Sequence, residues 1–117
     1  MIYYEEWGRI GDHCLVAEYK GNKIGAVWCR LYNENNKSFG FVSEDIPELS
    51  IAVDRHYRNK GIGTQLLKAF YKYLKEFAFH SISLSVDKRN PAVNLYLRTG
   101  FKTIKTNEND HIMLKEL

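Results

Sequence analysis

Several features that would define other classes of protein are missing from this sequence. Its two cysteines, Cys14 and Cys29, lie in separate apolar runs without CxxC spacing or a nearby histidine pair, so we expect buried reduced thiols and no metal site. No apolar run approaches the ~20 residues that cross a bilayer, and the N-terminus lacks the basic and apolar regions of a signal peptide. The sequence therefore predicts no membrane association and a cytoplasmic location.

A tract of one charge is also missing. The 17 basic residues are scattered among 14 acidic ones, and the net charge is only +3, so nucleic acid is not expected as a partner. This mild positive bias is compatible with an anionic ligand but does not require one. The length of 117 residues and the 44% hydrophobic content predict a single domain, residues 1–117.

The apolar spacing predicts an α/β fold with a mixed sheet and helices on its faces. We expect a short helix over Tyr3–Arg9, a hairpin turn at Gly21-Asn22 and a loop over Asn33–Ser38. The longest helix is expected over Ile62–Phe77, where apolar residues recur at helical spacing. The other predicted elements are a short helix over Pro91–Arg98 and strands over His13–Tyr19, Lys23–Tyr32, Glu48–Val53, Ser81–Val86, Phe101–Thr106 and His111–Lys115.

A glycine-bearing turn, Val53–Thr64, links a predicted buried strand to the longest predicted helix. Gly61 and Gly63 would let the backbone approach a ligand closely, and the unpaired amides at the start of a helix attract anions. Arg58 and Lys60 would add positive charge. Two glycines with this spacing are equally compatible with a simple change of chain direction. The turn is therefore a candidate anion site with a purely structural alternative.

Two common nucleotide-binding motifs do not fit this turn. The dinucleotide fingerprint needs a third small residue where this chain has Leu66, and the P-loop sequence Gly-Lys-Ser/Thr is absent. A phosphate at this turn must be bound in another way.

The segment Arg58-Asn59-Lys60-Gly61-Ile62-Gly63 resembles the cofactor signature of the GCN5-related N-acetyltransferase (GNAT) superfamily, which is Arg or Gln, two residues, Gly, one residue, Gly or Ala. Two further segments resemble the same family. Glu48–Val53 is similar to the strand before the signature, and Asn90–Phe101 is similar to a downstream cofactor motif. The resemblance runs from about His13 to the C-terminus.

This resemblance implies an acyl-CoA N-acyltransferase-like fold with a mostly antiparallel sheet that is splayed at the cofactor cleft. The strands 48–53 and 81–86 would separate, and the pantetheine of acetyl-coenzyme A would lie between them like an added strand. The cofactor-binding residues implied by the family are Ile51, Ala52, Val53, Arg58, Asn59, Lys60, Gly61, Ile62, Gly63, Thr64 and Asn90.

Two catalytic roles follow from the resemblance, and each has a structural alternative. Tyr96 matches a tyrosine that protonates the departing thiolate, although it could equally fill the core. Glu48 lies where family members often carry a general base, with Glu44 and Asp45 as alternatives, although it could be a solvated charge at a strand end. Asn90 before Pro91 could likewise be only a helix cap.

The main departure from the family lies at the front of the chain. Only some 12 residues precede the first clear strand, so the usual N-terminal strand and helix are expected to be missing. An uncovered sheet edge and apolar surface would favour a homodimer. The acceptor amine is left open, and the alternative to an acetyltransferase is a non-catalytic acyl-CoA-binding sensor or regulatory module.

Overall fold

The structure is a computed structural model that describes residues 1–5, 12–32, 35 and 40–117. These residues form strands and helices in the order β1 (Ile2–Tyr4), β2 (His13–Tyr19), β3 (Asn22–Arg30), β4 (Glu48–Val53), the 3-10 helix η1 (Arg55–Tyr57), α1 (Ile62–Glu76), β5 (Ser81–Asp87), α2 (Ala92–Arg98), β6 (Lys102–Thr106) and β7 (Asp110–Glu116). The predicted strands from residue 13 onward and both later helices are confirmed, with ends that differ by one or two residues.

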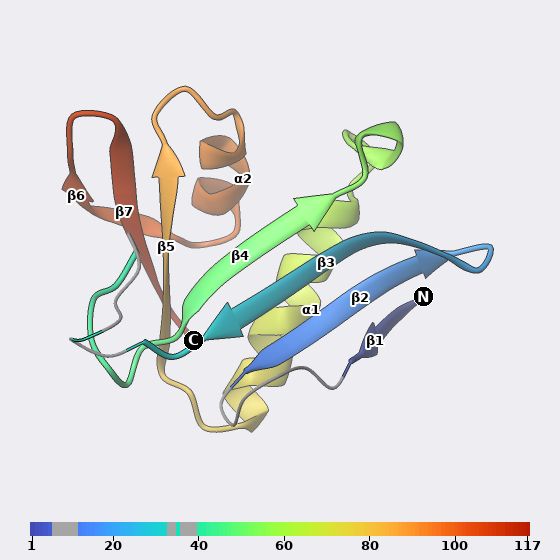
Figure 1. The fold of residues 1–117 in the computed structure, drawn as a ribbon, viewed down its shortest axis with the longest axis horizontal. Helices are drawn as coiled ribbons and strands as arrows, with labels where there is room; N and C mark the ends of the chain where they lie inside the picture. Colours follow the sequence, from blue (N-terminus) through green and yellow to red (C-terminus); the bar gives the residue numbers. More distant parts are fainter. Residues whose placement is uncertain (6–11, 33–34, 36–39) are drawn as a thin grey trace.

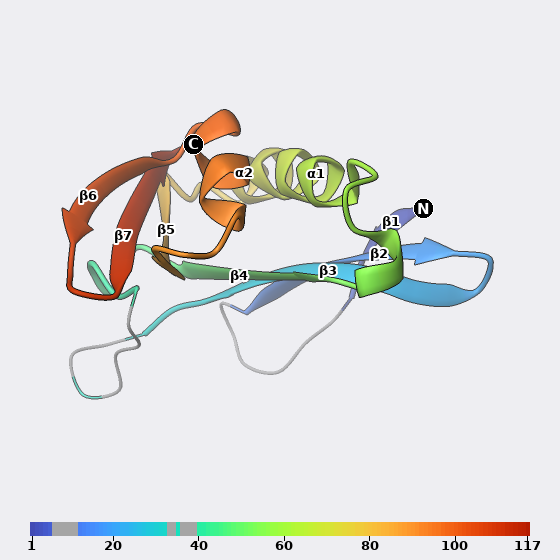
Figure 2. The same cartoon turned by 90° about the horizontal axis from the view of Figure 1, so that it is seen from above.

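The strands form one mixed seven-stranded sheet in the order β1-β2-β3-β4-β5-β7-β6. Every neighbouring pair is antiparallel except β4 and β5, which are parallel. Parallel neighbours require a crossover connection, and α1 provides it between β4 and β5. Figure 2 shows α1 and α2 on the same face of the sheet. This arrangement confirms the predicted fold class.

Strands β4 and β5 separate almost as soon as they meet. Their register contains a single pair, Glu48 with Ser83, whereas β4 pairs with β3 along its whole length. Beyond Glu48 the two strands diverge in a V (Figure 1). This divergence confirms the splayed sheet that the family resemblance implies.

Helix α1 packs its apolar stripe against the diverging sheet. Leu66, Leu67, Phe70 and Leu74 are buried at the spacing of one helix face. They share a core with strand residues such as Val27 and Leu84. Because the buried positions are the apolar ones at helical spacing, the sequence pattern predicts this helix correctly.

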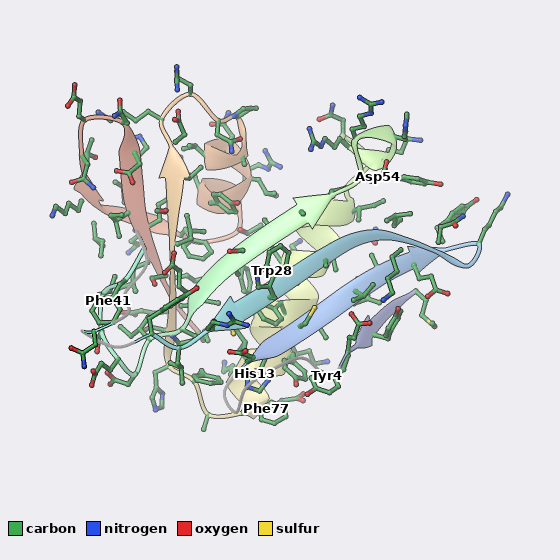
Figure 3. All side chains as sticks on the ribbon, in the orientation of Figure 1. Tyr4, His13, Trp28, Phe41, Asp54 and Phe77 are labelled. Carbon is green, nitrogen blue, oxygen red and sulfur yellow. The ribbon has the colours of Figure 1, made fainter. Side chains whose placement is uncertain are left out.

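The prediction of a helix over Tyr3–Arg9 is wrong where the structure describes it. Residues 2–4 form β1, which pairs antiparallel with β2. Ile2 packs against the core. Tyr4 (Figure 3) stacks on Tyr73 of α1, with 5.5 Å between ring centroids. Three consecutive apolar residues fit either period, and pairing to β2 decides for a strand. A strand of three residues therefore precedes β2.

The hairpin between β2 and β3 differs slightly from its predicted position. The hairpin turn lies at Lys20-Gly21, one residue earlier than predicted, because Tyr19 pairs with Asn22. Both turn residues have positive φ, 50° and 80°, as a type I′ turn requires. Residues 6–9 of the predicted first helix, and the predicted loop over 33–38 apart from residue 35, lie outside the described residues.

We predict that Phe70→Ala will lower the free energy of unfolding by about 3–5 kcal/mol, because the ring is fully buried and leaves a cavity. Urea unfolding of the variant and of Lys68→Ala, an exposed position on the same helix, measures the difference. The control should change stability by no more than about 0.5 kcal/mol. A loss below about 1 kcal/mol for Phe70→Ala would contradict this packing of α1.

Candidate active site

Two hydrogen bonds of Asp54 hold the start of the turn from β4 into α1. The Asp54 amide donates to the Ile24 carbonyl at 2.7 Å. The Asp54 carboxylate accepts the His56 amide at 2.9 Å and so caps η1. Figure 3 shows Asp54 at the end of β4, where the chain leaves the sheet. These bonds direct the following residues, 58–64, toward the start of α1.

Two glycines stand at the start of α1 for different reasons: Gly61 for its backbone conformation and Gly63 for close packing. Gly61 has φ 81°, in the left-handed region, and it is the N-cap residue of α1. A Cβ at Gly63 would lie 3.2 Å from Leu95 Cδ2, so Gly63 allows α2 to pack closely. No side chain of the described residues caps the first turn of α1, which leaves its amides available to an anion.

A pocket of about 670 Å³ opens at this point, between the end of β4, the turn, the start of α1 and the helix α2. Eleven residues of the predicted site line it: Ile51, Ala52, Val53, Arg58, Asn59, Gly61, Ile62, Gly63, Thr64, Asn90 and Tyr96. The structure thus brings together three segments that are separated in the sequence. Lys60 and Glu48 are not among the lining residues.

The pocket is electropositive. Arg58 and Arg98 both line it, and none of the described lining residues is acidic. The Arg58 side chain is held by a hydrogen bond from Nε to the Val53 carbonyl at 3.2 Å. Because the N-terminus of a helix carries partial positive charge, two arginines beside it repel the helix end and one another until an anion binds. The pocket is therefore suited to a negatively charged ligand.

Sequence reasoning missed five residues of the lining, of which Arg98 is the most informative. Pro91, Leu95 and Arg98 recur at spacings of four and three residues, which places them on one face of α2. That spacing was visible in the sequence, but which face of α2 meets the pocket depends on how the helix packs. The other two residues are Tyr57 and Ala92.

Tyr96 fills the core and also reaches the pocket. The residue is 8% exposed, and its ring packs edge-on against Phe101 with centroids 5.8 Å apart. Burial raises the pKa of its hydroxyl, so the group carries its proton at neutral pH. No hydrogen bond of this hydroxyl to another described residue is found. The hydroxyl can therefore donate to a group in the pocket.

Asn90 caps the start of α2. Its Oδ1 accepts the Ala92 amide at 2.9 Å, which confirms the capping interpretation. The residue also lines the pocket. Capping orients the side chain but does not prevent its amide group from meeting a ligand.

Glu48 lies on the other face of the sheet. Its neighbour Leu49 points into the core under the helices, so Glu48 points away from them, as alternation along a strand requires. The Glu48 Oε1 accepts the Gly40 amide at 3.0 Å. Of the alternative acidic residues, Asp45 accepts a hydrogen bond from the Ser43 hydroxyl, which lowers the pKa of Asp45.

Neither cysteine belongs to the pocket. Cys14 and Cys29 are free thiols buried in the sheet, as predicted, and burial raises the pKa of Cys29 to about 12. Among the described residues, no group of three His, Cys, Asp or Glu side chains could hold a metal ion. In the same part of the chain, neither helix has the length and apolar composition of a membrane span.

The chain belongs to the acetyltransferase (GNAT) family, because the sequence model of that family matches residues 1–101. It is 38% identical over 101 residues to an N-alpha-acetyltransferase of Sulfurisphaera tokodaii, covering 78% of this chain and 57% of the relative. It is 35% identical over 107 residues to a probable spermine N(1)-acetyltransferase of Bacillus subtilis subsp. natto, covering 85% and 66%. The chain thus spans just over half to two thirds of these relatives.

Solved structures share the fold. The PaiA N-acetyltransferase of Thermoplasma acidophilum, determined in complex with coenzyme A, superimposes with a TM-score of 0.75 at 24% identity, covering 92% of this chain and 62% of that one. The GNAT domain of S. lividans PAT gives a TM-score of 0.79 at 14% identity, covering 92% and 62%. At these identities the likeness concerns the fold alone.

Proposed function

We propose that this chain transfers the acetyl group of acetyl-coenzyme A to a primary amine by direct attack on the thioester. The observation that carries the proposal is the electropositive pocket between β4, the start of α1 and α2. Family membership supports the same activity. One relative is named an N-alpha-acetyltransferase and the other a probable spermine N(1)-acetyltransferase. Because these names point to different amines, the acceptor class is proposed only as a primary amine.

Different parts of the pocket would bind different parts of the cosubstrate. Residues 51–53 of β4 lie beyond the single pairing with β5, so backbone groups on that edge are available to the amides of pantetheine. The free amides of the first turn of α1, together with Arg58, would hold the diphosphate. We therefore assign residues 51–53, 58–64 and Asn90 to cosubstrate binding.

The acceptor must lose a proton before it can attack, because an alkyl amine has a pKa near ~10. We assign Glu48 as the proton acceptor. It precedes Ile51 by three strand residues, a rise of about 10 Å, so a water molecule would have to relay the proton. Glu44 and Asp45 lie on the adjoining segment 40–47, and their charge would favour a cationic acceptor.

The transfer itself makes one bond and breaks one. The amine nitrogen attacks the thioester carbonyl carbon, and a backbone amide near Ile51 would stabilise the charge that develops on the carbonyl oxygen. The carbon–sulfur bond then breaks, and the Tyr96 hydroxyl donates a hydrogen bond and finally its proton to the thiolate. The nitrogen of the new amide releases its surplus proton to water, and water returns a proton to Tyr96. Since a thiol has a pKa near ~8.5 and that of Tyr96 is raised above its usual value, Tyr96 assists departure without being essential.

We predict that Gly61→Ala will weaken acetyl-coenzyme A binding at least about ten-fold, whereas Gly21→Ala will not. Both glycines have φ near 80° and open space around the Cβ position, so both variants carry the same backbone strain of about 1–2 kcal/mol. Only the methyl group at Gly61 enters the proposed phosphate site. Calorimetric titration measures the affinities, and equal affinities for the two variants would contradict the assignment of the site.

We predict that Tyr96→Phe will lower kcat about 10- to 100-fold while KM for acetyl-coenzyme A changes less than about two-fold. Tyr71→Phe is the control, because Tyr71 is a partly buried tyrosine packed on Phe101 that does not line the pocket, although its hydroxyl is hydrogen-bonded to the Thr99 hydroxyl. Steady-state assays with spermine and with peptide N-termini measure both variants. Unchanged kcat in Tyr96→Phe would remove this residue from the mechanism. Wild-type protein that binds the cosubstrate but acetylates no amine would favour the non-catalytic module.

We also propose a homodimer. Both described helices lie on one face of the sheet (Figure 2), and the edge strand β1 has only three residues, with Tyr4 49% exposed. A second copy would shield this edge. Sedimentation velocity should give a dimer at micromolar concentration, and a monomer at high protein concentration would contradict the proposal.

A further inference from the structure

Ser83 is a buried polar residue at the point where β4 and β5 part. It is 0% exposed, although its neighbours Ile82 and Leu84 occupy the core under the helices. Ser83 therefore points to the opposite face of the sheet, the same face as its register partner Glu48. The segment 40–47 lies against this face, and Ser83 fixes both of its ends.

Two hydrogen bonds of Ser83 hold the segment. The Ser83 hydroxyl donates to the Gly40 carbonyl at 2.8 Å, and the Ser83 amide donates to the Pro47 carbonyl at 3.0 Å. One residue of β5 thus closes an eight-residue loop onto the junction of the two strands. A buried hydroxyl that has found its acceptor in this way resists displacement, because breaking the bond leaves polar atoms unpaired.

Gly40 in turn fixes the Glu48 carboxylate. The Gly40 amide donates to Glu48 Oε1 at 3.0 Å, and hydrogen bonds to an ionised acceptor are among the stronger ones. A Cβ on Gly40 would lie 2.7 Å from that oxygen and 2.8 Å from the Ser85 backbone nitrogen. Because the second contact is with backbone, residue 40 must be glycine for the approach to persist.

We propose that Gly40 and Ser83 are positioning residues for Glu48. Ser83 locates the Gly40 peptide, and the Gly40 amide holds the long Glu48 side chain in one orientation for proton transfer from the acceptor amine. The inference rests on the proposed function, which assigns Glu48 as the proton acceptor. Neither residue contacts the cosubstrate pocket, so both act on the acceptor half of the reaction.

Kinetics of five variants, four single and one double, test the inference. Gly40→Ala should lower kcat at least about ten-fold with less than two-fold change in KM for acetyl-coenzyme A, and Glu48→Gln should lower kcat at least as much. The double variant should equal Glu48→Gln within about two-fold, since Gly40 acts through Glu48. Ser83→Ala, which adds no volume, tests the same chain of contacts if Gly40→Ala fails to fold. Ser85→Ala, on the same strand and face, should retain wild-type kcat.

A second measurement does not depend on turnover. In an NMR pH titration the Gly40 amide proton should follow the ionisation of Glu48 in wild-type protein and should lose that response in Glu48→Gln. A missing response, or a double variant much slower than Glu48→Gln, overturns the inference. Full activity of Glu48→Gln does so as well, but leaves acetyl transfer itself intact. Wild-type protein that turns over no amine overturns both this inference and the proposed function.

Discussion

The single pairing of Glu48 with Ser83 is the constraint on which the rest of the structure depends. Had β4 and β5 paired along their length, the backbone groups of residues 51–53 would be satisfied by the sheet. Because the strands part after one pair, that edge stays open and α2 closes the far side of the gap. The same junction carries Glu48 on the opposite face. One departure from regular pairing thus creates the pocket and separates it from the acidic side.

The two faces of the junction differ in charge. On the helix face, Arg58 and Arg98 gather at the positive end of α1 without an acidic residue among the described lining. The other face carries Glu48, and two more acidic residues, Glu44 and Asp45, lie shortly before it in the sequence. Under the proposed function, the anionic cosubstrate and a cationic amine would each be attracted to a different side. Uncompensated positive charge in the pocket also costs stability, which ligand binding would restore.

Local chemistry made parts of this protein predictable from sequence. The periodic apolar residues of α1, the alternating strands and the Asn90-Pro91 helix start each depend on neighbours within a few positions. Their existence and type were predicted correctly. The helix expected over Tyr3–Arg9 failed at Tyr3 and Tyr4 because a run of three apolar residues has no period, and only pairing with β2 makes it a strand.

The sequence by itself determined the cofactor signature at Arg58–Gly63, the strand before it and the helix after it, since glycine conformation and helix-start amides are local properties. Tertiary structure alone decided which face of α2 brings Arg98 to the pocket, and that Gly40 would lie within 3.0 Å of Glu48. Those contacts join residues of different elements, so neither a helical nor a strand repeat in the sequence predicts them. They arise from how far β4 and β5 diverge and from what packs into the space between them.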